Sequence, residues 1–211
     1  AVPLAGMTAF AIYMELAIDL RDDDRFWNMA DPGWAYGLYY AIAGPLLLGV
    51  TTHFCEAGFS AEGALAFMKR HHITNFAAAP TAYRLMKASG LFDDAHETLE
   101  LRAASSAGEP LNTEVVTWVE KSLGCPVMDH YGQTETGMTC NNHHALDHLK
   151  HVGAMGVPMP GYRLAILDAE YKELPAGEPG VLAVDIKNSP AHFFQGYTWQ
   201  EKNPFVEGYY L

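Results

Sequence analysis

Strand-like and helical patterns alternate along the first two thirds of the chain, and this alternation constrains the fold more than any other feature. Segments with helical periodicity separate short apolar runs at residues 25–29, 50–54, 73–79, 101–104 and 125–128. Strands separated by helices pair in parallel, because the chain needs a crossover to return to the same side of the sheet. We therefore expect an α/β fold with a mostly parallel sheet flanked by helices.

Short-range signals place several of the helices. Ser60 and Asn112 can each cap the helix that follows, since their side chains can accept hydrogen bonds from the free N–H groups of a first turn. Residues 35–48 are strongly apolar and predict a buried helix, with an interruption at Gly44-Pro45.

The pattern changes after about residue 150. Alternating apolar runs at residues 162–167 and 181–186 flank a turn-rich segment at 175–180, an arrangement typical of antiparallel strands. We accordingly divide the chain into an α/β region over residues 1–150 and a small antiparallel region over residues 151–211.

The most informative motif is YGQTETG at residues 131–137, directly after the apolar run that ends at residue 128. We expect the strand to stop before this motif, which places the motif at the carboxyl edge of the sheet, where open α/β proteins bind ligands. Its aromatic ring can stack on a base, its hydroxyls can donate to phosphate, and its carboxylate can hold Mg²⁺. The motif predicts a nucleotide site.

A second segment has the same arrangement. The sequence SSAGEP at residues 105–110 follows an apolar run and precedes a predicted helix, so we expect a small-residue loop there. If the two strands pair in parallel across that helix, the two loops lie side by side at one edge of the sheet.

Together the two loops resemble the adenylate-forming enzymes, specifically acyl-CoA synthetases of the acetyl- and medium-chain type. In that family, Gly-Glu-Pro, a helix, and then an aromatic residue, Gly or Trp, and Gln-Thr-Glu form the adenine, α-phosphate and Mg²⁺ site. ADPGW at residues 30–34 is similar to the acyl-gate segment, and AAPTAYR at residues 78–84 is similar to a strand-to-helix junction. The resemblance thus covers nearly the whole chain, and it implies that residues 151–211 are the start of a small antiparallel β-barrel subdomain, which is incomplete here.

The resemblance implies roles for individual residues. Tyr131 would stack on adenine, Asp129 would lie near the adenine amino group, and Thr134 and Glu135 would act in catalysis, with Thr134 at the α-phosphate and Glu135 as the Mg²⁺ ligand. The nucleotide-binding set would be Gly108, Glu109, Pro110, Asp129, His130, Tyr131, Gly132, Gln133 and Thr134.

The acyl group would be lined by Trp34, Ala107 and Gly132. Gly132 stands where acetate-specific relatives carry a Trp that floors the carboxylate pocket. The resemblance therefore implies an acid larger than acetate, unless Gly132 is only a loop glycine with positive φ.

The family forms an acyl-adenylate from ATP and a carboxylic acid and then transfers the acyl group to CoA, which implies ATP, Mg²⁺ and CoA as cofactors or substrates. The 211 residues contain no Ser/Thr/Gly-rich phosphate loop ending in Lys, no ribose-binding Asp and no carboxyl-terminal catalytic Lys of the family type. We expect an internal piece of the large amino-terminal domain, inactive alone. The alternative is a noncatalytic nucleotide-binding or regulatory module.

Composition limits the partners and the compartment. The net charge of -12 and the isoelectric point near 5.1 argue against nucleic acid and anionic membrane surfaces, which attract clustered Lys and Arg. The 3 cysteines lack C-x-x-C spacing, so neither a disulfide framework nor a zinc site is indicated. We expect a cytoplasmic protein without a membrane span.

A histidine cluster offers an alternative chemistry. His143, His144, Asp147 and His148 would place two imidazoles at i and i+4 of a helix, superficially similar to an inverted zinc-protease motif. Asp147 stands where that motif has Glu, and no third ligand follows in a clear helix. The pattern favours a solvated or hydrogen-bonded cluster.

Overall fold

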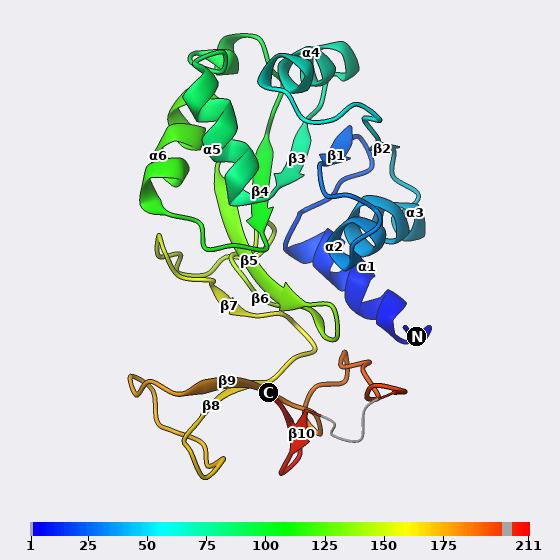
Figure 1. Cartoon of the computed structure of the whole chain (residues 1–211), viewed down its shortest axis with the longest axis vertical. Helices are drawn as coiled ribbons and strands as arrows, with labels where there is room; N and C mark the ends of the chain where they lie inside the picture. The colour runs from blue at the N-terminus through cyan, green and yellow to red at the C-terminus, as the bar shows by residue number, and fades with distance from the viewer. Residues whose placement is uncertain (1, 200–203) are drawn as a thin grey trace.

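A large sheet organises the fold. The computed structural model describes residues 2–199 and 204–211, and within them this sheet has seven strands in the order β2-β1-β3-β4-β5-β6-β7 (Figure 1). β1 to β5 pair in parallel, and β6 and β7 extend the sheet antiparallel. The strands are β1 (Phe26–Asn28), β2 (Thr52–His53), β3 (Asn75–Ala78), β4 (Ala103–Ala107), β5 (Val127–Gln133), β6 (Gly137–Asn141) and β7 (Val157–Pro158). The predicted α/β fold with a mostly parallel sheet is confirmed.

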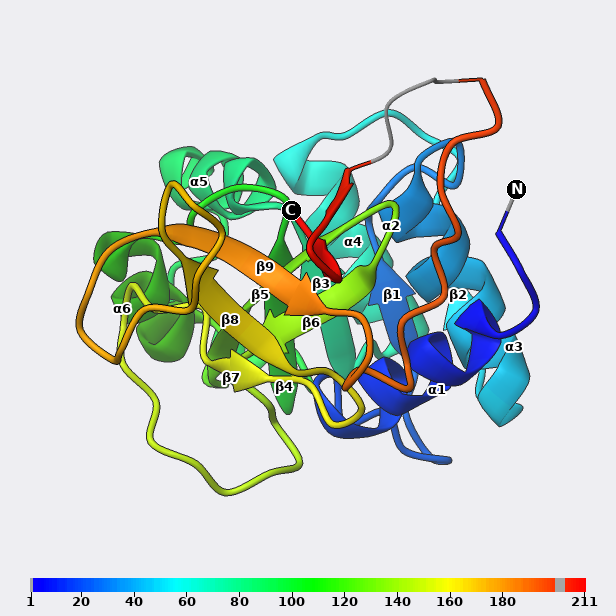
Figure 2. The ribbon, with the colours of Figure 1, turned by 90° about the horizontal axis from the view of Figure 1, so that it is seen from below.

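Helices cover both faces of this sheet (Figures 1 and 2). One face carries α4 (Ala61–His71), α5 (Pro80–Ser89) and α6 (Thr113–Ser122), and the 3-10 turn η2 (Ala95–Glu97) packs with them. The other face carries α1 (Gly6–Leu16), α2 (Ala35–Gly37), the π-helix η1 (Leu38–Ala43) and α3 (Gly44–Leu48).

Alternation along the strands creates two cores. In β3, Phe76 and Ala78 pack toward α4, α5 and α6, while Ala77 packs toward α1 and η1. In β1, Trp27 and Phe26 divide between the same two cores. Because successive strand side chains point to opposite faces, each strand supplies apolar area to both layers.

The predicted helix caps are present. The Ser60 Oγ accepts a hydrogen bond from the Gly63 N–H at 3.0 Å, and the Asn112 Oδ1 accepts one from the Val115 N–H at 3.0 Å. Pro80 opens α5 directly after β3, as expected for the strand-to-helix junction.

The apolar segment 35–48 departs from the prediction. It is helical throughout, but the irregularity is the π-helix η1, which precedes Gly44-Pro45. Pro45 has no N–H and cannot bond to the Ala41 carbonyl, which instead accepts a hydrogen bond from the Thr52 Oγ1 at 2.9 Å. The Thr52 hydroxyl of β2 therefore takes the place of the missing backbone donor.

A second, antiparallel sheet has four strands in the order β10-β11-β9-β8. It contains β8 (Leu164–Leu167), β9 (Val181–Asp185), β10 (Phe205–Val206) and β11 (Tyr209–Tyr210), and the predicted antiparallel pairing of β8 and β9 is confirmed. Tyr162, Val184 and Tyr210 join the core that contains Phe10 and Tyr40, so the small sheet packs on the first region (Figure 2).

The proposed division at residue 150 stays a prediction. The chain returns to the large sheet after residue 150, because β7 pairs with β6.

Cys55 is exposed and Cys125 and Cys140 are buried, all as free thiols. In the described ranges, no helix has the length and apolar character needed to cross a membrane.

Candidate functional site

Parallel pairing of β4 with β5 brings the two predicted segments together. Ser106 lies opposite Asp129 and Ala107 lies opposite His130. α6 forms the crossover between the two strands. Residues 108–110 therefore leave the sheet beside residues 131–132, as the sequence predicted (Figure 1).

The expected loops are, however, largely strands. β5 continues to Gln133, so the prediction that it stops before Tyr131 is wrong. The motif forms a hairpin in which residues 134–136 make the turn and Gly137 begins β6. Ser105 and Ser106 likewise lie inside β4, because hydrogen bonding to strands on both sides overrides the weak strand preference of small residues.

Tyrosine hydroxyls hold this hairpin at successive positions, and we call them the tyrosine collar. Its members are Tyr39, Tyr40, Tyr162, Tyr197 and Tyr210. None of these tyrosines was predicted from the sequence, since each lies far along the chain from residues 131–137 and belongs to no local motif.

Three collar bonds fix the hairpin backbone. The Tyr39 hydroxyl donates to the Thr134 carbonyl at 3.3 Å, and the Tyr162 hydroxyl donates to the Thr136 carbonyl at 2.6 Å. The Tyr40 hydroxyl accepts from the Met138 N–H at 3.1 Å. The turn is therefore anchored from the helical layer on one side and from the small-sheet region on the other.

The other two collar bonds reach side chains. The Tyr210 hydroxyl donates to the Gln133 Oε1 at 2.7 Å, and the Tyr197 hydroxyl donates to the Glu135 Oε1. A cavity of about 210 Å³ lies against the turn, with Tyr39, Thr134, Glu135 and Tyr197 among its lining residues.

The Gly-Glu-Pro segment is held differently. Gly108, Glu109 and Pro110 are all exposed, and Gly108 has a φ of 96°. The Glu109 carboxylate accepts hydrogen bonds from the Thr81 hydroxyl at 2.8 Å and from the Arg84 guanidinium at 2.5 Å. The hydrogen bond from Thr81 and, to a smaller extent, that from Arg84 lower the pKa of the Glu109 carboxyl. Glu109 thus ties the loop to the start of α5.

Asp129 and His130 lie at different depths. Burial raises the pKa of the half-buried Asp129 carboxyl to about 6, although the N–H groups of Leu111 and His130 bond to it. The His130 ring is buried in the interior rather than at the surface: its Nε2 donates to the Asn142 carbonyl at 3.1 Å, and its Nδ1 accepts from the Tyr13 hydroxyl at 2.8 Å. Burial lowers the pKa of His130, which keeps the ring neutral.

Tyr131, predicted to stack on a base, is half-buried on β5, and its hydroxyl accepts a hydrogen bond from the Gln133 Nε2 at 3.1 Å. The pairing of β4 with β5 brings the backbone at Tyr131 next to the exposed residues 108–110. This placement is compatible with a stacking role.

The predicted acyl residues are not equally accessible. Trp34 is 76% exposed at the start of α2, whereas Ala107 is 3% exposed and belongs to the core with Phe10. A Cβ on Gly132 would lie 2.1 Å from the Gly137 carbonyl oxygen. Glycine is therefore required there by the close approach of β6, not by a positive φ.

The turn offers oxygen ligands that fit Mg²⁺. The Glu135 carboxylate follows the exposed Thr134 hydroxyl, and both are hard oxygen donors. Within residues 2–199 and 204–211, no group of three or more His, Cys, Asp or Glu side chains could hold a metal. The donor set thus suits an ion shared between one carboxylate and bound phosphates, as Mg²⁺ commonly is.

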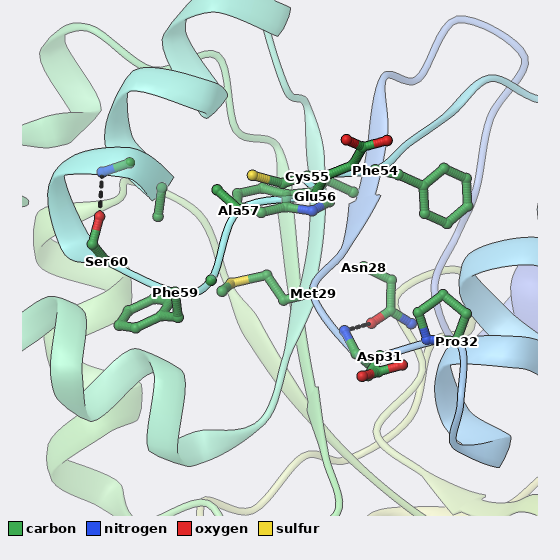
Figure 3. Close-up of a pocket in the computed structure, with 15 residues that line it drawn as sticks. Asn28, Met29, Asp31, Pro32, Phe54, Cys55, Glu56, Ala57, Phe59 and Ser60 are labelled. Carbon is green, nitrogen blue, oxygen red and sulfur yellow. Dashed lines mark hydrogen bonds between the residues drawn. The ribbon is translucent and has the colours of Figure 1, made fainter.

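A larger cavity of about 410 Å³ lies elsewhere, at the ends of β1 and β2 beside the start of α4 (Figure 3). Asp31 and Pro32 of the predicted acyl-gate segment line it, together with Cys55 and Phe59, whereas the predicted residues of the hairpin do not. This cavity was not predicted from the sequence, because it forms between segments that are distant along the chain.

The histidine cluster does not form a helix. Residues 143–148 are bends and irregular backbone, and the His148 Nε2 accepts a hydrogen bond from the His143 N–H at 2.9 Å. The i, i+4 geometry required for the alternative zinc site is therefore absent from this segment.

Comparisons with known proteins agree with this geometry. The family model described as "AMP-binding enzyme" matches residues 3–198. The acetyl-coenzyme A synthetase of Methanothrix soehngenii is 35% identical over 199 residues, which cover 91% of this chain and 29% of that protein.

Among solved structures, an acyl-CoA synthetase of Brucella canis is 51% identical with a TM-score of 0.94, and the match covers 99% of this chain and 39% of that one. The ATP-bound structure of MatB from Rhodopseudomonas palustris is 25% identical with a TM-score of 0.84, over 98% of this chain and 40% of that one. The chain therefore spans less than half of these relatives.

Proposed function

The chain belongs to the AMP-binding enzyme family, and from that premise we propose that it carries the nucleotide-binding edge of an ATP-dependent, AMP-forming acyl-CoA synthetase, an acid–thiol ligase. The match to acetyl- and acyl-CoA synthetases supports the ligase assignment. The ATP in the related MatB structure supports ATP as the nucleotide.

One observation carries the proposal: β4 and β5 pair in parallel with Ala107 opposite His130. This register places the Gly-Glu-Pro segment and the YGQTETG hairpin at the same carboxyl edge, where an α/β sheet binds ligands. Neither segment alone could surround a nucleotide.

The proposed reaction has two steps. A carboxylate oxygen attacks the α-phosphorus of ATP, which forms the acyl-adenylate and releases pyrophosphate. The CoA thiol then attacks the acyl carbonyl and displaces AMP. Both steps need charge stabilisation at the α-phosphate, which positioned hydrogen-bond donors and cations supply.

Residues of the chain would divide this work. Residues 108–110 and Tyr131 would enclose the adenine, and Asp129 would accept a hydrogen bond from the adenine amino group. The Thr134 hydroxyl would donate to an α-phosphate oxygen. Glu135 would hold Mg²⁺, which supplies positive charge against the phosphates.

We propose that the acid is longer than acetate, because position 132 carries glycine where acetate-specific relatives carry tryptophan. The substitution Gly132→Trp would displace β6, so it does not isolate pocket size. The direct test compares acetate with butyrate, hexanoate and octanoate in the intact enzyme. Highest kcat/KM for acetate would refute the proposal.

The chain alone should not form acyl-adenylate, because its 211 residues contain no phosphate loop of the family type. ATP–pyrophosphate exchange with a panel of carboxylates tests both the intact enzyme and the 211-residue chain alone. We expect exchange in the intact enzyme and background in the chain alone, with weak AMP binding retained. An intact protein that binds AMP without exchange would instead be the noncatalytic module.

We place the enzyme in the cytoplasm, where three free thiols are stable.

A further inference from the structure

Tyr197 reaches the turn of the motif from a segment that follows β9. Its hydroxyl donates to the Glu135 Oε1, although the two residues are far apart in sequence. The hydroxyls of Tyr197 and Tyr210 also interact with each other, so the contact belongs to a connected group.

The other tyrosines of the collar leave the orientation of the Glu135 carboxylate free, and Tyr197 restricts it. Bonds from Tyr39 and Tyr162 fix the backbone on each side of Glu135. They do not orient its carboxylate, which stands at the end of a flexible side chain on a half-buried turn residue. The Tyr197 bond engages one carboxylate oxygen and leaves the other oxygen able to bind a cation.

We propose that Tyr197 is a positioning residue, which orients the Glu135 carboxylate so that its second oxygen binds the divalent cation at the nucleotide phosphates. The inference rests on the proposed function, because it takes Glu135 as the metal ligand. Hydrogen bonds from outside the first ligand shell fix ligand orientation, and their loss commonly weakens metal binding about 10- to 100-fold.

The test uses the 211-residue chain with AMP and Mn²⁺, a paramagnetic substitute for Mg²⁺, and measures free Mn²⁺ by electron paramagnetic resonance. We expect Tyr197→Phe to weaken AMP-dependent Mn²⁺ binding about 10-fold or more, and Glu135→Gln to abolish it. Tyr209→Phe is the matched control, because the Tyr209 hydroxyl donates to another half-exposed carboxylate, Glu173 Oε1, at 2.5 Å. It should bind Mn²⁺ like the unmodified chain.

A second readout does not depend on metal. Tyrosine labelled with ¹³C at Cζ reports the hydrogen-bonding environment of each hydroxyl by NMR. In Glu135→Gln, the Cζ chemical shift of Tyr197 should change, because the charged acceptor of its hydroxyl is replaced by a neutral amide. This measurement decides the contact even if Tyr197→Phe fails to fold.

The outcomes separate the two proposals. Weakening by Glu135→Gln but not by Tyr197→Phe overturns the role of Tyr197 and leaves the metal assignment intact. Absence of AMP-dependent Mn²⁺ binding in the unmodified chain, or binding unaffected by Glu135→Gln, overturns the metal assignment and the positioning role with it. An unchanged Cζ chemical shift of Tyr197 in Glu135→Gln also overturns the positioning role.

Discussion

The two segments at the proposed nucleotide-binding edge are held in different ways. Residues 108–110 are exposed, and Glu109 ties them to α5 through Thr81 and Arg84 at the protein surface. Residues 133–138 are held by the tyrosine collar, whose members come from the helical layer and from the small-sheet region.

The difference shows how one edge of a sheet can combine a segment that can move, residues 108–110, with a segment that is held rigidly, residues 133–138. Exposed ionic contacts contribute little and are screened by salt, whereas hydrogen bonds to buried backbone groups are costly to lose. We therefore expect the hairpin, which we propose to face the reacting phosphate, to be preorganised by the collar. The Gly-Glu-Pro side can adjust to the base.

The largest expected effect concerns the turn carboxylate. In the intact enzyme, Glu135→Gln should raise the adenylation barrier by several kcal/mol, because a ligand for the compensating cation is lost. Stability should change by less than about 0.5 kcal/mol, as for most surface loop substitutions. Pyrophosphate exchange and thermal unfolding measure the two quantities, and near-normal exchange at saturating Mg²⁺ would contradict the assignment.

The next effect tests the backbone constraint in the hairpin. Gly132→Ala should cost about 3 kcal/mol, because a Cβ would lie 2.1 Å from the Gly137 carbonyl oxygen and β6 must move. Urea unfolding gives the loss. Gly58→Ala is the control, since a Cβ there meets no atom within 4 Å. Equal stability of the two variants would refute the close-approach argument.

Removing one collar hydroxyl should have a smaller effect. Tyr162→Phe leaves the Thr136 and Ala191 carbonyls without this donor, at a cost of about 1–2 kcal/mol. The same urea experiment applies, and Tyr209→Phe should lose less because its acceptor Glu173 is half-exposed. A collar without structural importance would show no difference between them.

Asp129 should make stability depend on pH. Burial raises its folded-state pKa from 3.8 to about 6, so the folded protein holds the proton more tightly than the unfolded chain does. Between about pH 4 and pH 6.5, the native chain should therefore lose stability relative to Asp129→Asn as pH rises, by about 1 kcal/mol after allowance for solvent screening. Parallel unfolding curves across that range would exclude the effect.

The smallest effect is expected at the Gly-Glu-Pro anchor. Arg84→Ala should cost less than about 1 kcal/mol, since Arg84 and Glu109 have 43% and 42% exposed side chains. Added salt should reduce even this difference. Because the pKa of Glu109 is lowered in the folded state, its contribution should also fade as pH drops below its ordinary value of 4.5. A loss as large as that of Tyr162→Phe would erase the contrast between the two segments.

Local signals account for the features that were predicted correctly. Ser60 and Asn112 cap their helices through bonds to residues three positions away, and such bonds depend on adjacent sequence only. Alternating strands and helices imply a parallel sheet, and that topology was enough to bring residues 108–110 beside residues 131–132.

The errors have a common cause in neighbours that are distant along the chain. β5 extends to Gln133 because β6 pairs with it, and the short run that forms β6 has no distinctive pattern of its own. The alternative that Gly132 is only a loop glycine with positive φ is wrong for the same reason, since Gly132 lies on β5 against the backbone of β6, whereas its place in the acyl site stays a prediction.

The amino-acid sequence alone was sufficient to infer the α/β class, the two nucleotide-edge motifs and the family resemblance, because all three are encoded in short patterns along the chain. The tyrosine collar, the depth of His130 and the contact of Tyr197 with Glu135 became visible only in the folded chain. Their bonds join residues separated by up to 117 positions, and the packing of the helical layer and the small sheet around one hairpin determines which hydroxyls meet it.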